Sequence, residues 1–374
     1  MKISVLASDL SDNATGRAHL LARLLAPRYE VDVVGPQFGD GVWAPARDGA
    51  VVYRGVRAGR YPGFAWRVRD ILDLVDGEIL VASKLRPTSF GLGLLARRHR
   101  RRPLVLDIDD WELGFFYHSD GWGRVGRALN LADPNGLSWT WLTERLVGRA
   151  DAVTVASRFL EQRFGGTFLP HARDTDAWDP TRYNRAEARA RLELGARQVV
   201  MFLGTPREHK GVDDLVDAVG LLGPEVVLVL VGVDPAGRRA RRWSGIAHVR
   251  TTAEIPFDDV PRYLVAADVV AVPQRATTDT LGQVPAKLFD AMALGRPIVS
   301  TSVSMIPEIL DGCGCLVPPG NVPALAGAIR RLLDNADEAA AMGRRARDRC
   351  DARYSFRAAR ATLFPLIDSV APRA

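Results

Sequence analysis

The chain has 374 residues, which is enough for two domains of ordinary size. Apolar residues make up 47% of it, so each domain can bury a core, and the absence of a run of about eighteen apolar residues excludes a membrane-spanning helix. The formal charge of +6 comes from 50 basic residues, mostly arginine, against 44 acidic ones. This arginine bias is typical of a GC-rich genome more than of selection for nucleic acid, and we predict no nucleic-acid partner.

The first half of the chain alternates between strand-like and helix-like patterns. Its opening stretch soon turns polar, which indicates a strand rather than a signal peptide. The alternation is typical of a parallel sheet covered by helices on both faces, and the aromatic-rich stretch 112–148 interrupts it. We expect strands over 2–7, 30–35, 50–55, 78–83, 103–109 and 150–157, and helices over 17–26, 64–75 and 88–99.

A run of arginines, "ARRHRRRP" at 96–103, stands out in this half. Residues Arg97–Arg102 could make a weak peripheral contact with an anionic membrane. Alternatively, they form a solvated helix end, where cations complement the helix dipole. We favour the solvated helix end.

The second half repeats the alternation after an aperiodic connector at 169–184. The expected strands are 198–204, 225–232, 247–251, 267–273, 297–301 and 314–319, and the expected helices are 211–221, 257–266, 285–294, 322–334, 336–349 and 355–371. The predicted fold class is therefore α/β, with two doubly wound parallel-sheet domains facing a cleft. In such sheets ligands bind outside the carboxyl ends of the strands.

The three cysteines do not have the spacing of a zinc site, because Cys313 and Cys315 are separated by one residue and no histidine cluster lies nearby. A reduced, intracellular protein is the simplest interpretation. We predict a cytoplasmic location, with a possible peripheral position at the inner face of the membrane.

Two loops of the second half carry candidate anion-binding groups. Gly204 ends a strand, and the loop after it brings Arg207 and Lys210 toward the strand ends, where a diphosphate would fit. The alternative is a plain loop with surface charges.

The second loop leads into the helix that begins near Pro285. Backbone N–H groups at 284–287 can bind phosphate, and Lys287 adds a charge. Asp290, one turn further on, would accept hydrogen bonds from a ribose diol. The alternative for Asp290 is an exposed position, or a local pair with Lys287 or Arg296.

Five motifs of this half, in order over about 170 residues, resemble the retaining glycosyltransferases of family 4, which have the GT-B fold. The motifs are "LPHARDTDAWDP" (169–180), "FLGTPREHKGVDDLVDA" (202–218), "PRYLVAADVVAVPQ" (261–274), "PAKLFDAMALGRPIVST" (285–301) and "IPEILDGCGCLVPPGNVPALAGAI" (306–329). The resemblance implies an acceptor-side domain over 1–172, a nucleotide-sugar domain over 173–352 and a C-terminal helix over 353–374 that crosses back to the first domain.

The resemblance also implies roles for the donor-side residues. Lys210 matches the family's phosphate-binding lysine. The preceding basic position of the family is Thr205 here, so Arg207 would replace that charge, or Lys210 would act alone. Glu308 matches the acidic residue of the family's "PE" step, with a packing or a ligand role.

The family has two glutamates eight positions apart. Asp290 matches the second, which holds the ribose, but the first falls on Gly282, which has no carboxylate. Gln283, with Asp279 and Thr280, would substitute for it, and the backbone of Gly282, Gln283 and Val284 would face the sugar and phosphate.

The first half resembles the family less closely. Gly16, in the loop after the first strand, would allow close backbone approach, and Arg17 would meet a phosphate. Family members carry a histidine near "DIDDWE" (107–112), and this chain has none there. Asp110 is predicted to contact a sugar or acceptor hydroxyl and is grouped with Lys210 and Arg207 as catalytic.

The neighbours of Asp110 are further acceptor-side candidates. They are Asp109, Trp111, Glu112 and, from the preceding strand end, Lys84, for which a surface position is the alternative. The acids would suggest Mg²⁺, but Lys, Arg and helix termini can neutralise a leaving diphosphate, so we predict no metal. Stacking on the acceptor or packing in the core are the alternatives for the aromatic residues Trp111, Phe115, Phe116, Tyr117, Trp122, Trp139 and Trp141.

The predicted function is transfer of a sugar from a UDP- or GDP-linked donor to an acceptor hydroxyl, without a cofactor. Retention and a place in bacterial glycan, glycolipid or natural-product synthesis are what the resemblance implies. The alternatives are a nucleotide-sugar epimerase of GT-B shape and a non-catalytic nucleotide-sugar-binding protein. An NAD-dependent dehydrogenase is disfavoured because no G-x-G-x-x-G follows the first strand.

Overall fold

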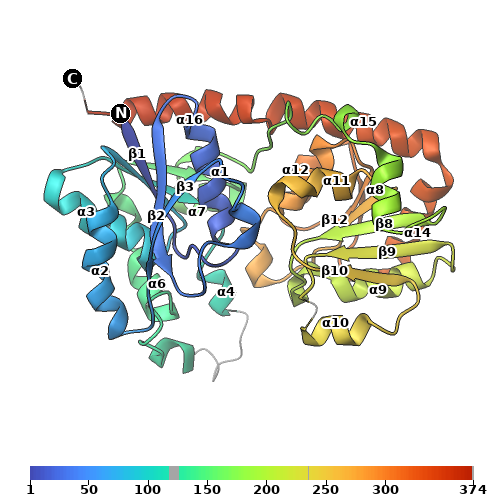
Figure 1. Cartoon of the computed structure of the whole chain (residues 1–374), viewed down its shortest axis with the longest axis horizontal. Coiled ribbons are helices and arrows are strands. Elements are labelled where there is room, and N and C mark those ends of the chain that lie inside the picture. Colours follow the sequence, from blue (N-terminus) through green and yellow to red (C-terminus); the bar gives the residue numbers. More distant parts are fainter. Residues whose placement is uncertain (118–125, 235, 373–374) are drawn as a thin grey trace. The chain divides into compact units, whose positions relative to one another are not determined.

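The computed structural model describes residues 1–117, 126–234 and 236–372 of the chain. They form two compact units, each with its own sheet and helices on both faces of that sheet (Figure 1). The first unit contains Met1–Pro170, Leu281–Val284 and Ala359–Ala374, and the second contains His171–Thr280 and Pro285–Ala358. Trp122, one of the aromatic candidates, lies outside the described residues.

The sheet of the first unit is parallel, with the strand order β3-β2-β1-β4-β5-β6-β7. The strands are β1 Lys2–Leu6, β2 Glu30–Gln37, β3 Val52–Arg57, β4 Ile79–Ser83, β5 Leu104–Ile108, β6 Ala152–Val155 and β7 Thr167–Phe168. β1 lies between β2 and β4, so Val5 pairs with Val33 on one side and Val81 on the other. β4 and β5 are buried along their whole length, as expected for strands covered on both faces.

The helices of the first unit are α1 Thr15–Leu25, α2 Gly63–Leu74, α3 Leu92–Arg100, α4 Gly114–Tyr117, α6 Leu137–Glu144, α7 Arg158–Phe164 and the part of α16 (Phe356–Val370) from Ala359 onward. α7 begins at Ser157, whose hydroxyl accepts a hydrogen bond from the Leu160 amide. The guanidinium of Arg360 donates to the Leu24 and Arg23 carbonyls, so it satisfies the end of α1.

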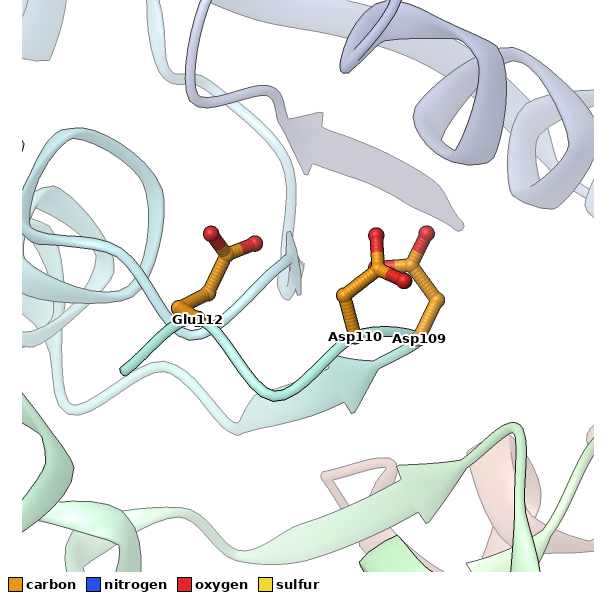
Figure 2. A group of neighbouring side chains, drawn as sticks. All are labelled: Asp109, Asp110 and Glu112. Carbon is orange, nitrogen blue, oxygen red and sulfur yellow. The ribbon is translucent and has the colours of Figure 1, made fainter. Parts of the chain in front are cut away.

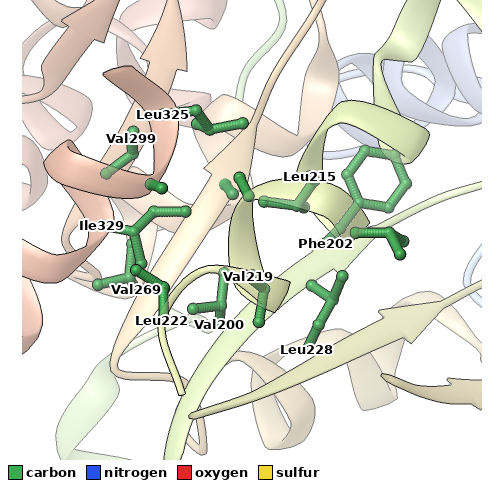
Figure 3. Close-up of a cluster of buried hydrophobic side chains, with 14 of the residues drawn as sticks. Val200, Phe202, Leu215, Val219, Leu222, Leu228, Val269, Val299, Leu325 and Ile329 are labelled. Atoms are coloured by element: carbon green, nitrogen blue, oxygen red, sulfur yellow. The ribbon is translucent and has the colours of Figure 1, made fainter. Parts of the chain in front are cut away.

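The sheet of the second unit is also parallel, with the order β10-β9-β8-β11-β12-β13. The strands are β8 Gln198–Leu203, β9 Val226–Val231, β10 Val249–Thr252, β11 Val269–Val272, β12 Ile298–Thr301 and β13 Cys315–Val317. The helices are α8 Arg185–Arg191, α9 Val212–Gly220, α10 Arg238–Trp243, α11 Val260–Leu264, α12 Ala286–Ala293, α13 Ile306–Leu310, α14 Val322–Asp334 and α15 Ala336–Arg353. Side chains of β8, α9 and α14, among them Phe202, Leu215 and Ile329, form one core cluster on this sheet (Figure 3).

The predicted α/β class with two doubly wound parallel sheets is confirmed. Seven short elements were not predicted: β7 and the helices α4, α6, α7, α8, α10 and α13. β7 has two residues, too few to show alternation. α10 reads "RRARRW" and buries only Ala240 and Trp243, so it lacks an apolar periodicity.

Candidate functional site

The first candidate region lies at the carboxyl ends of β1, β4 and β5. The strand order of the first sheet reverses between β1 and β4, and the crevice at such a point is where ligands bind in doubly wound sheets. Lys84 follows β4 directly, and Asp109 follows β5 directly. The topology therefore brings together acceptor-side candidates that are 25 residues apart in sequence.

The acids after β5 surround the ammonium group of Lys84. Asp109 and Asp110 lie side by side, with Glu112 nearby (Figure 2). The Lys84 Nζ is 2.7 Å from the Asp109 Oδ1, 2.8 Å from the Asp110 Oδ2 and 3.7 Å from the Glu112 Oε1. Lys84 is only 6% exposed, so the alternative of a surface lysine is wrong.

Burial and charge compete within this group. Burial raises the pKa of Asp109 to about 6, although the Lys84 ammonium opposes that shift. Burial alone would lower the pKa of Lys84, but the charges of Asp109, Asp110 and Glu112 outweigh it and raise the pKa above its usual value. Lys84 is therefore a permanent cation at neutral pH.

Arg17 does not face a ligand site. Its Nε and Nη2 each lie 2.8 Å from a carboxylate oxygen of Asp107 in β5, and Nη2 also donates to the Leu169 carbonyl. The side chain is 1% exposed. The predicted phosphate contact of Arg17 is not what the structure shows, because the buried Asp107 needs a counter-ion. Gly16, beside it, is half-buried at the start of α1.

The segment Leu281–Val284 belongs to the first unit by its contacts. A Cβ at Gly282 would lie 3.2 Å from the Trp111 Cβ and 3.2 Å from the Phe159 ring. Gly282 is thus closely packed, which explains why no carboxylate stands there. Gln283 lies beside Asp110, with its Nε2 3.4 Å from the Asp110 Oδ1, and Val284 is buried.

The second candidate region lies at the carboxyl end of β8 in the second unit. Lys287, from the first turn of α12, places its Nζ 3.7 Å from the centre of the Phe202 ring. A Cβ on Gly204 would lie 3.3 Å from that Nζ, and Gly204 has a φ of +104°, a conformation that favours glycine. The Lys210 Nζ donates to the Thr205 carbonyl at 2.8 Å.

These two lysines repel each other electrostatically. Burial first, and then the charge of Lys210, lowers the pKa of Lys287 well below its usual value. An anion bound beside both ammonium groups would relieve that repulsion. Arg207 is exposed, and the Thr205 hydroxyl lies 3.4 Å from Glu254.

Asp290 is 9% exposed and forms an ion pair with Arg173. Neither alternative expected from the sequence is found, because Arg296 donates to backbone carbonyls and Lys287 lies over Phe202. Arg173 also lies 3.4 Å from the Ala286 carbonyl, so it links the connector to the start of α12. Sequence reasoning missed Arg173, although it is the one basic residue of the motif "LPHARDTDAWDP".

Glu308, in the first turn of α13, is exposed, and Asp279 lies 2.8 Å from the buried His209. Thr280 is buried, and its hydroxyl donates to backbone carbonyls of its own loop. Asp279 and Thr280 thus lie in the loop before α12, whereas Glu308 lies on α13.

A pocket of about 600 Å³ opens in the first unit beside Trp111. The Trp111 ring contacts Tyr117, and the guanidinium of Arg163 lies 4.7 Å from its centre. The guanidinium of Arg145 stacks 3.2 Å from the centre of the Trp141 ring, which is 47% exposed. The lining residues are Leu113, Tyr117, Trp141, Glu144, Arg145, Val147, Arg163 and Phe164. Of the other aromatic candidates, Trp139 packs on Tyr61.

Two arginines of the run have described side-chain contacts, and both side chains are half-buried against the first unit rather than fully solvated. Arg97 pairs with Asp151 at 3.2 Å, and Arg102 donates to the carbonyls of Val75, Gly77 and Ala96. Among the helices that the structure describes, none combines the length and the apolar character needed to cross a membrane.

Comparisons with known proteins match both units. A family model for the "Glycosyl transferase 4-like domain" matches residues 14–175, and one for "Glycosyl transferases group 1" matches residues 197–335. A GDP-mannose-dependent alpha-(1-6)-phosphatidylinositol monomannoside mannosyltransferase of Mycolicibacterium smegmatis is 31% identical over 304 residues, or 75% of this chain and 74% of that one. The protein of the same name from Mycobacterium tuberculosis (strain CDC 1551 / Oshkosh) is 28% identical over 90% of this chain and 89% of that one.

Solved structures share the fold at lower identity. Sucrose-phosphate synthase from Thermosynechococcus elongatus superposes with a TM-score of 0.76 at 20% identity, covering 99% of both chains. HepE of Anabaena, solved in complex with UDP and glucose, superposes with a TM-score of 0.74 at 19% identity, covering 99% of this chain and 100% of that one.

Proposed function

This chain belongs to the glycosyltransferases with 4-like and group 1 domains and has their GT-B fold, and from that premise we propose how it works. It uses a nucleotide-sugar donor and is a glycosyltransferase of glycan biosynthesis. We propose that the donor is GDP- or UDP-linked, with GDP-mannose the first to test because two relatives are named for it. We also propose a bacterial, cytoplasmic enzyme that transfers with retention and without a metal or other cofactor.

The observation that carries the donor-site proposal is the pair of lysines around Gly204. Lys210 comes from the loop after β8 and Lys287 from the first turn of α12, and both lie where β8 ends. In addition, α12 begins at Pro285 without a side-chain cap, so its first amides are available to an anion. We propose that this region holds the diphosphate and that Asp290 holds the ribose.

The proposed reaction needs charge stabilisation more than a protein nucleophile. The bond between the anomeric carbon and the diphosphate oxygen breaks as the acceptor oxygen bonds to that carbon on the same face. The departing phosphate takes the acceptor's proton. Lys210 and Lys287, with Arg207 from the exposed part of the loop, would stabilise the charge that develops on the diphosphate.

The direct test is incubation of the purified chain with GDP-mannose or UDP-glucose, with and without acceptors. We expect transfer to an acceptor with an α-anomeric product by NMR and no loss of activity in EDTA. Isomerised donor in the absence of acceptor would instead identify an epimerase. Tight donor binding without turnover across the acceptor panel would identify a binding protein.

The ribose contact has its own test in Asp290→Ala. Because hydrogen bonds to a charged group contribute about 1.5–3 kcal/mol, the variant is expected to bind nucleoside diphosphate roughly 10- to 100-fold more weakly. Calorimetry with a 2′,3′-dideoxy analogue is the control. The analogue should lose much less affinity, and an equal loss for both nucleotides would reject the ribose role.

The acceptor proposal rests on the pocket beside Trp111. The aromatic rings of Tyr117 and Trp141 and the Arg145 guanidinium suit an acceptor with an apolar part and an anionic group. The two mannosyltransferase relatives are named for a phosphatidylinositol-based acceptor, which agrees with that chemistry. A lipid-borne acceptor would bring the enzyme to the inner face of the membrane as a peripheral protein.

Trp141→Ala tests this pocket. Loss of the exposed ring is expected to raise the KM for a phospholipid-linked acceptor about tenfold, since an aromatic contact of this kind is worth about 0.5–1.5 kcal/mol beyond its burial. The donor affinity should not change. Trp66→Ala is the matched control, because Trp66 is 80% exposed on α2 and does not line the pocket. An equal effect of both substitutions would contradict the assignment.

A further inference from the structure

We propose that the Lys84 ammonium occupies the cation position of a three-carboxylate site in the first unit, where a divalent metal ion would otherwise bind. By filling that position, Lys84 acts as a positioning residue that fixes the Asp110 carboxylate. The use of Asp110 in the reaction rests on the proposed glycosyl transfer. The occupation of the cation position by Lys84 does not depend on it.

The geometry of the carboxylates is that of a cation site. One oxygen each from Asp109, Asp110 and Glu112 lies within 4.8 Å of the others, and no other such group occurs among the described residues. Ca²⁺ binds oxygens at about 2.3–2.6 Å, so oxygens on opposite sides of the ion lie up to about 5 Å apart. The three carboxylates therefore have a spacing that one ion could bridge.

Lys84 already supplies that charge. Its Nζ makes hydrogen bonds to Asp109 and Asp110, at 2.7 and 2.8 Å, and lies 3.7 Å from the Glu112 Oε1. The Glu112 Oε1 is buried and has no hydrogen-bond partner, whereas Oε2 pairs with Arg86 at 2.7 Å. This Glu112 oxygen is thus held by the ammonium charge alone, as an ion's ligand would be.

The backbone at Lys84 is held in an unfavourable conformation to place this side chain. Its φ is +74°, in the left-handed region that costs a non-glycine residue about 1–2 kcal/mol. The Lys84 amide donates to the Asp107 carbonyl at 2.8 Å, and its own carbonyl accepts from the Ser89 hydroxyl at 2.7 Å. Strain that the surroundings enforce in this way is typical of functional sites.

A lysine at position 84 is unusual for this chain, which otherwise uses arginine for most of its basic residues. Only four of its 50 basic residues are lysines: Lys2, Lys84, Lys210 and Lys287. An ammonium is a compact point charge that can sit among three carboxylates, whereas a guanidinium is a planar fork suited to one. Arg86, which contacts one carboxylate of the same group, shows the second geometry.

The consequence for the reaction concerns Asp110. Lys84 holds its Oδ2, and its Oδ1 lies on the side of Gln283. Asp109, Asp110 and Glu112 carry three negative charges against the two positive charges of Lys84 and Arg86. One negative charge therefore remains, and a fixed carboxylate of this kind can accept a hydrogen bond from an acceptor hydroxyl.

The test compares two substitutions. Lys84→Gly empties the cation position and suits the left-handed backbone, whereas Lys84→Met removes the charge but fills the space. We expect Lys84→Gly to bind Ca²⁺ or Mn²⁺, with a Kd of about 10⁻³ M or below, and its Tm to rise with the logarithm of the metal concentration. Wild type and Lys84→Met should show no rise.

The matched control is Lys2→Ala. Lys2 also contacts three carboxylates, those of Glu30, Asp32 and Asp76, but these do not converge on one point as the Lys84 group does. If Lys84→Gly does not fold without metal, its refolding yield in CaCl₂ is compared with that in NaCl of equal ionic strength. A metal response of Lys84→Gly no greater than that of Lys2→Ala would overturn the proposal.

Activity measurements separate the role of Lys84 in filling the cation position from its role in positioning Asp110. In Lys84→Met we expect the KM for the acceptor to rise at least about tenfold, with the affinity for the donor nucleotide unchanged. If wild type transfers no sugar, the proposed function fails while the metal response can still hold. If wild type is active and Lys84→Met keeps the same acceptor KM, the positioning role fails.

Discussion

Lys210→Ala is expected to lower kcat by roughly 10²–10³-fold, the usual cost of removing a group that stabilises developing charge. The Lys210 Nζ lies near the end of β8 and donates a hydrogen bond to the Thr205 carbonyl. A contact made mainly to the departing diphosphate affects kcat more than the KM for the donor. Steady-state kinetics with the preferred donor and calorimetry with the nucleoside diphosphate measure the two effects separately.

Two further variants make this test specific. Lys210→Arg keeps a charge in the loop and should recover part of the activity, while Lys2→Ala removes a lysine from the first unit and should lose none. Burial and the charge of Lys210 both lower the pKa of Lys287. Loss of Lys210 removes the second cause, so a larger fraction of Lys287 is protonated and partly compensates for the lost charge. Unchanged turnover together with unchanged nucleotide affinity in Lys210→Ala would reject the phosphate role.

The largest effect on stability is expected from Arg17→Ala. The substitution leaves the Asp107 carboxylate buried without its counter-ion, since among the described side chains only the Thr154 hydroxyl still donates to it. Breaking one side of a buried ion pair costs about 3–5 kcal/mol. The readout is hydrogen exchange of the β5 amides, because a two-unit chain need not unfold in one transition.

The control for this effect is Arg67→Ala, which breaks an exposed pair with Asp70 in α2. A surface pair contributes about 0–1 kcal/mol, so little change is expected there. The double variant Arg17→Met with Asp107→Leu should recover most of the stability, because apolar residues can replace a buried pair. If Arg17→Ala destabilises the first unit no more than Arg67→Ala does, the Arg17–Asp107 pair does not stabilise the fold.

Sequence patterns predicted the sheets well because they are parallel and buried. Strands such as β4, β8 and β9 are continuous apolar runs between turn residues, and α12 and α14 have clear apolar faces. These patterns are local, so they can be recognised in the sequence without knowledge of the fold. Short elements such as α10 do not carry them.

The partners of charged residues could not be predicted in the same way. Arg17 and Asp107 are 90 residues apart, and Arg173 and Asp290 are 117 residues apart. Which cation neutralises a buried acid depends on the strand order and on packing, and neither is a local property. The burial of Lys84 has the same origin, because β4 and β5 are neighbours only in the folded sheet.

Because lysine is scarce, few groups of this chain can react with amine-directed reagents. An amine-acylating reagent can react with four lysines and the N-terminus. Lys84 is buried and fully protonated, so it resists acylation, whereas the lowered pKa of Lys287 leaves more of its neutral, nucleophilic amine. A bound nucleotide should lower the acylation of Lys287 and Lys210 by covering both amines, which makes donor occupancy readable by peptide mass without any substitution.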